Sequence, residues 1–173
     1  FKNKGIDIFI DVLGRIKEIS KKTIVAYILV PANHSGPDKD LMGRLGKADF
    51  DNPLVNRYLT HGLHEVEYDP IMNKLKEMGH NNSSSEKVKF VFVPCYLNRE
   101  DGVFNMDYYD LLIGFDLTIF ASYYEPWGYT PLESIAFKIP TITTTFSGFG
   151  LWVRKLKVEQ NKGVMIVEGR EDD

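Results

Sequence analysis

Two short runs of this chain are almost continuously apolar and rich in β-branched residues. They span residues 23–30 and 88–93, and each is followed directly by a proline, Pro31 or Pro94. A strand with one face in water alternates apolar and polar side chains, whereas a strand covered on both faces does not. The two runs therefore predict buried strands of a parallel sheet, whose connections usually contain helices.

Helical patterns alternate with strand patterns along the rest of the chain. Apolar residues at spacings of three and four predict a helix over residues 2–22. Asp69-Pro70 is typical of an N-cap and a first-turn proline, and Gly79 can end the helix that follows. The other predicted elements are a helix beginning after Asp107, strands at 117–121, 141–146 and 163–167, and a helix at 131–138. The alternation predicts an α/β fold with a Rossmann-like, doubly wound and mostly parallel sheet.

Residues 33–62 carry the weakest pattern. Prolines and glycines are mixed with charges of both signs, and no period is sustained. Thirty residues without structure are unusual inside a compact domain. We therefore interpret this stretch as an excursion from the domain, with a short helix near Leu54 to Leu59.

Length and composition exclude several classes of function. A chain of 173 residues corresponds to about one domain, and its net charge of −3 indicates neither a nucleic-acid partner nor an anionic membrane. No apolar run approaches the length of a membrane span. Cys95 is the single cysteine and follows an apolar run, so we expect a buried structural thiol. His61 and His64 are a possible zinc pair, but the simpler prediction is that the chain has no metal site.

Residues 121–133 carry the densest local chemistry. The predicted strand before them leads into a turn with Gly128, and we predict that Thr130 caps the next helix with Pro131 in its first position. Glycine lets a ligand approach the backbone closely. A helix N-terminus presents free amides and a partial positive charge, which suits a phosphate.

Two carboxylates flank this turn. Glu125 precedes it and Glu133 lies within the predicted helix, so both can border one cleft at the carboxyl end of the strand. Residues of this stretch also have purely structural interpretations. Glu133 can complete a capping box with Thr130, and Trp127 can be a packing residue.

The string Tyr123-Tyr-Glu-Pro-Trp-Gly-Tyr-Thr-Pro-Leu-Glu133, followed by Ser147-Gly-Phe-Gly150, resembles the glycogen synthases of the animal and fungal type. Phe1-Lys-Asn-Lys-Gly5, Asp69-Pro-Ile71, Lys87-Val-Lys-Phe90 and Asp107-Tyr108 fall in the same order as in that family. The resemblance implies a retaining glycosyltransferase of the GT-B fold. It further implies that residues 1–173 form the C-terminal half of that fold, the nucleotide-sugar-binding domain.

Roles for individual residues follow from the resemblance. Lys4 and the helix amides at Gly128, Tyr129 and Thr130 would bind the diphosphate, and Glu125 would hold the sugar hydroxyls. Lys4 and Glu125 are accordingly the expected catalytic residues.

Three more residues complete the implied site. Trp127 would lie close to the glucose, Glu133 would accept hydrogen bonds from the ribose, and Tyr108 would stack on the base. Leaving-group stabilisation would be the main catalytic task. The resemblance implies no cofactor and no metal.

The implied reaction transfers glucose, with retention, from UDP-glucose or ADP-glucose to the 4-hydroxyl of an α-1,4-glucan. We expect a cytoplasmic enzyme, and an oligomer is possible at full length. Residues 33–62 replace a longer helical insertion that contributes to tetramer contacts in the family. The acceptor-binding domain is not part of the sequence, so we expect this chain alone not to elongate glucan.

Two other functions remain open at this point. One is a nucleotide-sugar epimerase of the same fold, which would release no glucan. The other is a non-catalytic binding module derived from such an enzyme. Titration with nucleotides and nucleotide sugars separates these possibilities.

Overall fold

The computed structural model describes residues 1–47, 52–157 and 162–169. The chain divides into two compact units. Unit 1 comprises Phe1–Ile10 with Tyr109–Asp173, and unit 2 comprises Asp11–Tyr108. No helix in the described part has the length and apolar character needed to cross a membrane.

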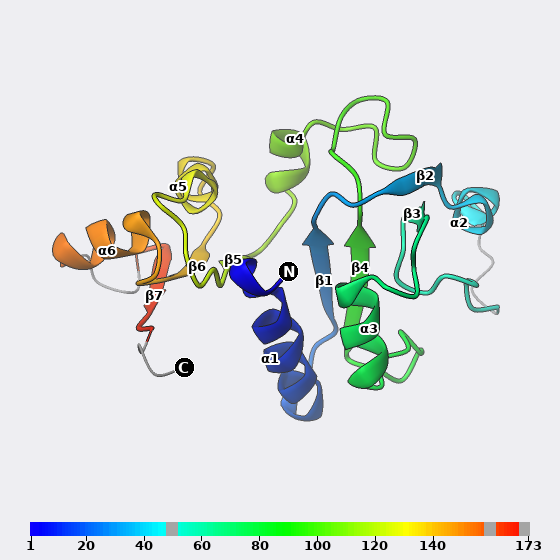
Figure 1. Cartoon of the computed structure of the whole chain (residues 1–173), viewed down its shortest axis with the longest axis horizontal. Helices are drawn as coiled ribbons and strands as arrows, with labels where there is room; N and C mark the ends of the chain where they lie inside the picture. Colours follow the sequence, from blue (N-terminus) through cyan, green and yellow to red (C-terminus); the bar gives the residue numbers. More distant parts are fainter. Residues whose placement is uncertain (48–51, 158–161, 170–173) are drawn as a thin grey trace. The chain divides into compact units, whose positions relative to one another are not determined.

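Unit 2 is built on a parallel pair of strands. β1 (Ile24–Leu29) pairs with β4 (Val88–Val93), and Ile24 lies opposite Val88. Figure 1 shows the two strands as neighbouring arrows that point the same way. The predicted strands are confirmed to within one residue of their ends. Pro94 follows β4 directly and Pro31 comes two residues after β1, and a proline cannot donate to a ladder.

The core of unit 2 lies around β4 and α3 (Pro70–Glu77). Phe90 and Phe92 are fully buried, as is Leu75 of α3. Asp69 caps α3, since its Oδ1 accepts the amides of Ile71 and Met72, both at 2.9 Å. The predicted cap and first-turn proline are thus confirmed.

The stretch after β1 contains more structure than its sequence indicates. β2 (His34–Pro37) pairs antiparallel with β3 (His61–Leu63), and α2 (Lys39–Arg44) follows β2. The short helix predicted near Leu54 to Leu59 is wrong. Tyr58 and Thr60 instead exchange backbone hydrogen bonds with Phe92 on the edge of β4, at 2.7 and 3.0 Å. An open strand edge offers unpaired donors and acceptors, and this segment satisfies some of them.

The helix predicted over residues 2–22 is interrupted. A 3₁₀ turn, η1 (Lys2–Lys4), ends at Gly5, and α1 (Ile6–Ile19) begins after it. Gly5 has φ +65°, a left-handed conformation that ends η1 and that glycine adopts without steric cost. The apolar spacing was therefore correct for α1 but not for the residues before it.

Unit 1 contains a three-stranded parallel sheet in the order β5 (Thr118–Phe120), β6 (Thr141–Thr144) and β7 (Val164–Val167). α5 (Tyr129–Ala136) connects β5 to β6, and α6 (Gly148–Lys155) follows β6. α4 (Tyr108–Leu112) precedes β5. The prediction of an α/β fold with mostly parallel sheets is confirmed.

Candidate functional site

The first residues of the chain lie on the turn that follows β5. The amide of Tyr123 donates to the carbonyl oxygen of Asn3 at 2.9 Å, and Asn3 Nδ2 donates to the carbonyl oxygen of Tyr124 at 3.3 Å. A side chain at Gly5 would collide with the carbonyl oxygen of Ala121. A glycine at position 5 is therefore what allows these two backbones to approach each other.

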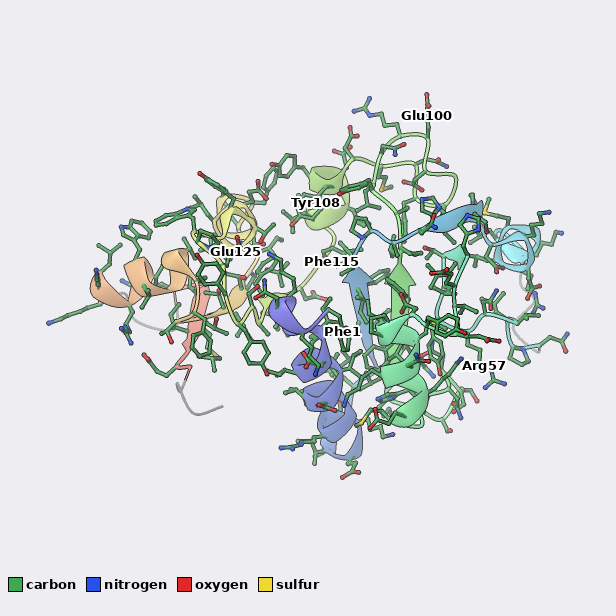
Figure 2. All side chains as sticks on the ribbon, in the orientation of Figure 1. Phe1, Arg57, Glu100, Tyr108, Phe115 and Glu125 are labelled. Carbon is green, nitrogen blue, oxygen red and sulfur yellow. The ribbon has the colours of Figure 1, made fainter. Side chains whose placement is uncertain are left out.

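This contact brings together Lys4 and Glu125. The ammonium of Lys4 forms an ion pair with Glu125 Oε2, and the two side chains are 57% and 27% exposed. Figure 2 labels Glu125 on the turn before α5. A solvent-exposed ion pair contributes little to stability, about 1 kcal/mol or less. Its significance is therefore in placing a cation and a carboxylate side by side.

The N-terminus of α5 differs from its prediction. Thr130 is not the cap, because Gly128 occupies that position with φ +95° and the helix begins at Tyr129. Glycine tolerates this backbone conformation, so the helix starts two residues earlier. Pro131 is consequently the third helical residue. Glu133 lies in the second turn, too far along to form a capping box.

The first amides of α5 are available to a ligand. No side chain among the described residues caps this helix, and Pro131 has no amide hydrogen. The side chain of Glu125 lies close by, with its Cγ 3.4 Å from where a Cβ on Gly128 would stand. Thr130 is exposed. The free amides, Glu125 and Lys4 thus surround one helix N-terminus.

The two glycines of Ser147-Gly-Phe-Gly150 favour a loop, but these residues instead form the start of α6. Ser147 is the N-cap of α6, and its Oγ accepts the amide of Gly150 at 3.0 Å. The sequence did contain a helix signal, because serine is a favoured N-cap. The two glycines that follow have low helix propensity and hid this signal.

The start of α6 supports the turn that carries Glu125. The amide of Gly148 donates to the carbonyl oxygen of Glu125 at 3.1 Å. The amide of Phe149 donates to the carbonyl oxygen of Trp127 at 2.7 Å. A side chain on Gly148 would collide with the carbonyl oxygen of Pro126. The string Ser147–Gly150 therefore stabilises the backbone conformation of the string Tyr123–Glu133.

Trp127 packs inside unit 1. Its ring lies against a buried cluster of Phe149, Val153 and Val164, with its centroid 6.2 Å from that of Phe149. The packing interpretation thus has direct support. A role for Trp127 beside the glucose stays a prediction.

Glu133 has a partner that the sequence did not indicate. The hydroxyl of Tyr109 donates to Glu133 Oε1 at 2.9 Å, and this hydrogen bond raises the pKa of Tyr109. The Tyr109 ring stacks on Phe137, with centroids 5.2 Å apart. No local pattern relates residues so far apart in the chain. Tyr108 is the last residue of unit 2, and its stacking on a base stays a prediction.

Carboxylates and histidines elsewhere have structural roles. The Asp-x-Asp string Asp38-Lys39-Asp40 is used within α2, because Asp38 caps that helix and Asp40 pairs with Arg44 at 2.8 Å. His61 uses both ring nitrogens, with Nε2 donating to the carbonyl oxygen of Asp101 at 2.8 Å and Nδ1 lying 2.9 Å from Thr60 Oγ1. Within the described ranges, no group of three or more candidate ligands could hold a metal ion.

Comparisons with known proteins point to one family. Residues 50–173 match the family model described as glycogen synthase. The chain is 32% identical over 236 aligned residues to glycogen [starch] synthase isoform 2 of Saccharomyces cerevisiae, covering 98% of this chain and 33% of that protein. The corresponding identities are 31% for the Neurospora crassa enzyme and 28% for the mouse liver enzyme, over 98% of this chain and 32% of each relative. The chain therefore spans about a third of the length of these relatives.

Proposed function

Because the chain belongs to the glycogen synthase family, we propose that it forms the donor site of a retaining glycosyltransferase. The donor is a nucleotide-diphosphate glucose, with UDP-glucose preferred, and the acceptor is an α-1,4-glucan. The observation that carries the proposal is the contact between Lys4 and Glu125 beside the uncapped N-terminus of α5.

The diphosphate is bound by Lys4 and the first amides of α5. Lys4 carries a positive charge, and the amides of Tyr129 and Thr130 lie at the N-terminus of α5, which is the positive end of the helix dipole. A phosphate oxygen competes with Glu125 for the ammonium of Lys4. Binding of the donor thus releases the Glu125 carboxylate to accept hydrogen bonds from the glucose hydroxyls.

Catalysis in this scheme depends on the leaving group. Cleavage of the glycosidic bond places positive charge on the sugar ring and negative charge on the departing diphosphate. A fixed cation and fixed amide donors stabilise that negative charge more in the transition state than in the ground state. Glu125 orients the sugar and is not assigned as a nucleophile.

The nucleoside extends from the diphosphate toward Glu133. One carboxylate oxygen of Glu133 accepts from Tyr109. The other accepts from a ribose hydroxyl, while Tyr108 stacks on the base. Tyr109 thereby fixes the orientation of the carboxylate that receives the ribose.

The whole protein is proposed to combine this site with an acceptor-binding domain in a GT-B arrangement, and to act in the cytoplasm. The relatives are aligned over more positions than this chain has residues, so they contain segments that it lacks. We propose that part of this difference lies at residues 33–62, as a shortened insertion.

Calorimetric titration of the protein with UDP, ADP and their glucose conjugates tests the proposal. UDP-glucose should bind, and Lys4→Met should weaken UDP and UDP-glucose alike by about tenfold or more, because a charge-assisted hydrogen bond is worth about 1.5–3 kcal/mol. Glu125→Gln should weaken UDP-glucose more than UDP. Lys2→Met removes an exposed lysine from the same turn and is the matched control. The proposal fails if no nucleotide binds or if the Lys4 and Lys2 variants behave alike.

A further inference from the structure

The parallel pairing of β5 with β6 is interrupted at the turn that carries Glu125. The last pair of the ladder is Phe120 with Thr143, and an isolated bridge joins Glu125 to Ser147 farther along. Between these two pairs the β5 side has four residues and the β6 side has three. The β5 side therefore contains one residue more than regular pairing allows, as in a β-bulge, and bulges beside active sites redirect side chains.

A side-chain hydroxyl bridges this interruption. Thr144 is the last residue of β6, and its Oγ1 donates to the carbonyl oxygen of Ser122 at 2.8 Å. Ser122 is 7% exposed, and among the described residues no other group donates to this oxygen. A buried carbonyl group without a donor is costly, so the hydroxyl of Thr144 holds the bulged segment against β6.

The main chain of Thr144 is bonded to the other turn of the site. Its carbonyl oxygen accepts from the amide of Ser147 at 3.3 Å and from Ser147 Oγ at 3.0 Å. Ser147 is the residue that caps α6. Thr144 is therefore bonded both to the turn that carries Glu125 and to the turn that begins α6, and it fixes one relative to the other.

The backbone of Glu125 is held by the same segment. Its amide donates to the carbonyl oxygen of Phe146 at 3.2 Å, and its carbonyl oxygen accepts from the amide of Gly148 at 3.1 Å. Its side chain, in contrast, pairs with Lys4. In the proposed function a phosphate oxygen of the donor takes over Lys4. The position of the released carboxylate then depends on the backbone that carries it.

We propose that Thr144 is a positioning residue of the donor site, which keeps the Glu125 carboxylate within reach of the glucose hydroxyls. It acts through the carbonyl oxygen of Ser122 and makes no contact with the donor. The assignment rests on the proposed function, because that function is what places the glucose on Glu125. UDP has no glucose, so loss of the Thr144 hydroxyl should weaken the binding of UDP-glucose and leave that of UDP nearly unaffected.

Calorimetric titration of Thr144→Val with UDP-glucose and UDP tests this role. Valine keeps the β-branched shape and removes the hydroxyl. UDP-glucose should bind about three- to tenfold more weakly, as for one lost hydrogen bond, and the affinity for UDP should change by about twofold or less. Thr144→Ser keeps the hydroxyl and should restore the affinity for UDP-glucose. Thr144→Ala also lacks the hydroxyl and replaces Thr144→Val if circular dichroism shows that variant to be unfolded.

Thr141→Val is the matched control, because it removes a hydroxyl from the same strand. Thr141 is 1% exposed, and its Oγ1 is bonded to no other described residue. This variant should bind both ligands as the unchanged protein does. A second comparison uses Glu125→Ala. If Thr144 acts through Glu125, Thr144→Val should weaken UDP-glucose binding by about twofold or less in that background.

Four results would overturn the positioning role. They are an unchanged affinity of Thr144→Val for UDP-glucose, an equal loss for UDP and UDP-glucose, failure of Thr144→Ser to restore binding, and a full effect of Thr144→Val in the Glu125→Ala background. The donor site fails in a different way, because it is refuted when the unchanged protein binds no nucleotide, and the positioning role then fails with it. Binding of UDP-glucose that tolerates Thr144→Val refutes the positioning role alone.

Discussion

His80 is a buried histidine with no hydrogen-bond partner among the described residues. It is 3% exposed, and neither ring nitrogen is bonded to another described residue. Its ring lies edge-on to Phe90 with centroids 4.6 Å apart, and its Nε2 is 3.6 Å from where a Cβ on Gly14 of α1 would stand. Burial lowers the pKa of His80, the charge of Lys17 lowers it further, and Glu86 opposes them. The residue therefore serves as an apolar side chain.

His80 should make stability depend on pH. The unfolded chain takes up a proton near pH 6.5, whereas the folded protein does not until a lower pH. Stability is then complete above about pH 6.5, falls as the pH drops below that value, and levels off below the folded pKa. Urea unfolding between pH 8 and 5 should show this fall, and His80→Leu should reduce it.

The comparison variant for this experiment is His64→Leu, which replaces an exposed histidine of the same unit and should remove only the part of the fall that His64 contributes through the pKa of His34, the smallest of the causes of that shift. Burial also lowers the pKa of His34, with contributions from His61 and His64, so part of the fall should persist in His80→Leu. An identical pH profile for the protein and its His80→Leu variant would rule out this account.

At the scale of elements, the site depends on two neighbouring strand-to-helix turns. The turn after β5 carries Glu125, and the start of α6 after β6 donates hydrogen bonds to its backbone. Both turns need glycine, for different reasons. Gly128 adopts a positive φ, whereas Gly148 leaves room for the carbonyl oxygen of Pro126.

Gly148→Ala should destabilise unit 1. The added methyl group collides with backbone, which cannot move aside as a flexible side chain would. We expect a loss of about 1–3 kcal/mol in the free energy of unfolding, as for overpacked sites, together with weaker UDP-glucose binding. Urea denaturation and calorimetry measure the two effects.

Gly43→Ala provides the comparison. Gly43 is also helical, in α2, but no heavy atom of the described residues outside its own helix lies within 4 Å of where its methyl group would stand. Alanine is favoured over glycine in a helix by about 0.5–1 kcal/mol, so this variant should be neutral or more stable. Equal losses in the two variants would show that the contact with Pro126 is unimportant.

At the scale of the whole molecule, the chain covers only part of the length of its relatives, and this limits the transferase activity that we expect from it. The chain corresponds to about a third of each relative and includes the proposed donor site. Transfer requires an acceptor hydroxyl held in line with the sugar, and positioning of this kind contributes several kcal/mol to catalysis. We therefore expect binding of the donor without transfer.

Incubating the 173-residue chain with labelled UDP-glucose and a maltooligosaccharide primer tests this expectation. No label should enter the glucan, although UDP-glucose binds. A full-length relative from the glycogen synthase family is the positive control. Primer extension by the chain itself would contradict the assignment of the acceptor site to another domain.

The sequence alone determined the features that depend on neighbouring residues. The strands β1 and β4 follow from apolar runs stopped by proline, and the start of α3 follows from Asp69-Pro70. The long string around Glu125 was sufficient to indicate the family. These features could be predicted because burial and local hydrogen bonding act over a few residues.

Only the tertiary structure decided which residues of the candidate site lie together. The pairing of Lys4 with Glu125 and of Tyr109 with Glu133 joins residues far apart in the chain. The start of α5 was misplaced because Gly128 adopts a conformation that sequence pattern does not reveal. Such contacts depend on which backbones approach closely, and that is set by the alignment of whole strands and helices. A local sequence pattern therefore cannot predict these contacts.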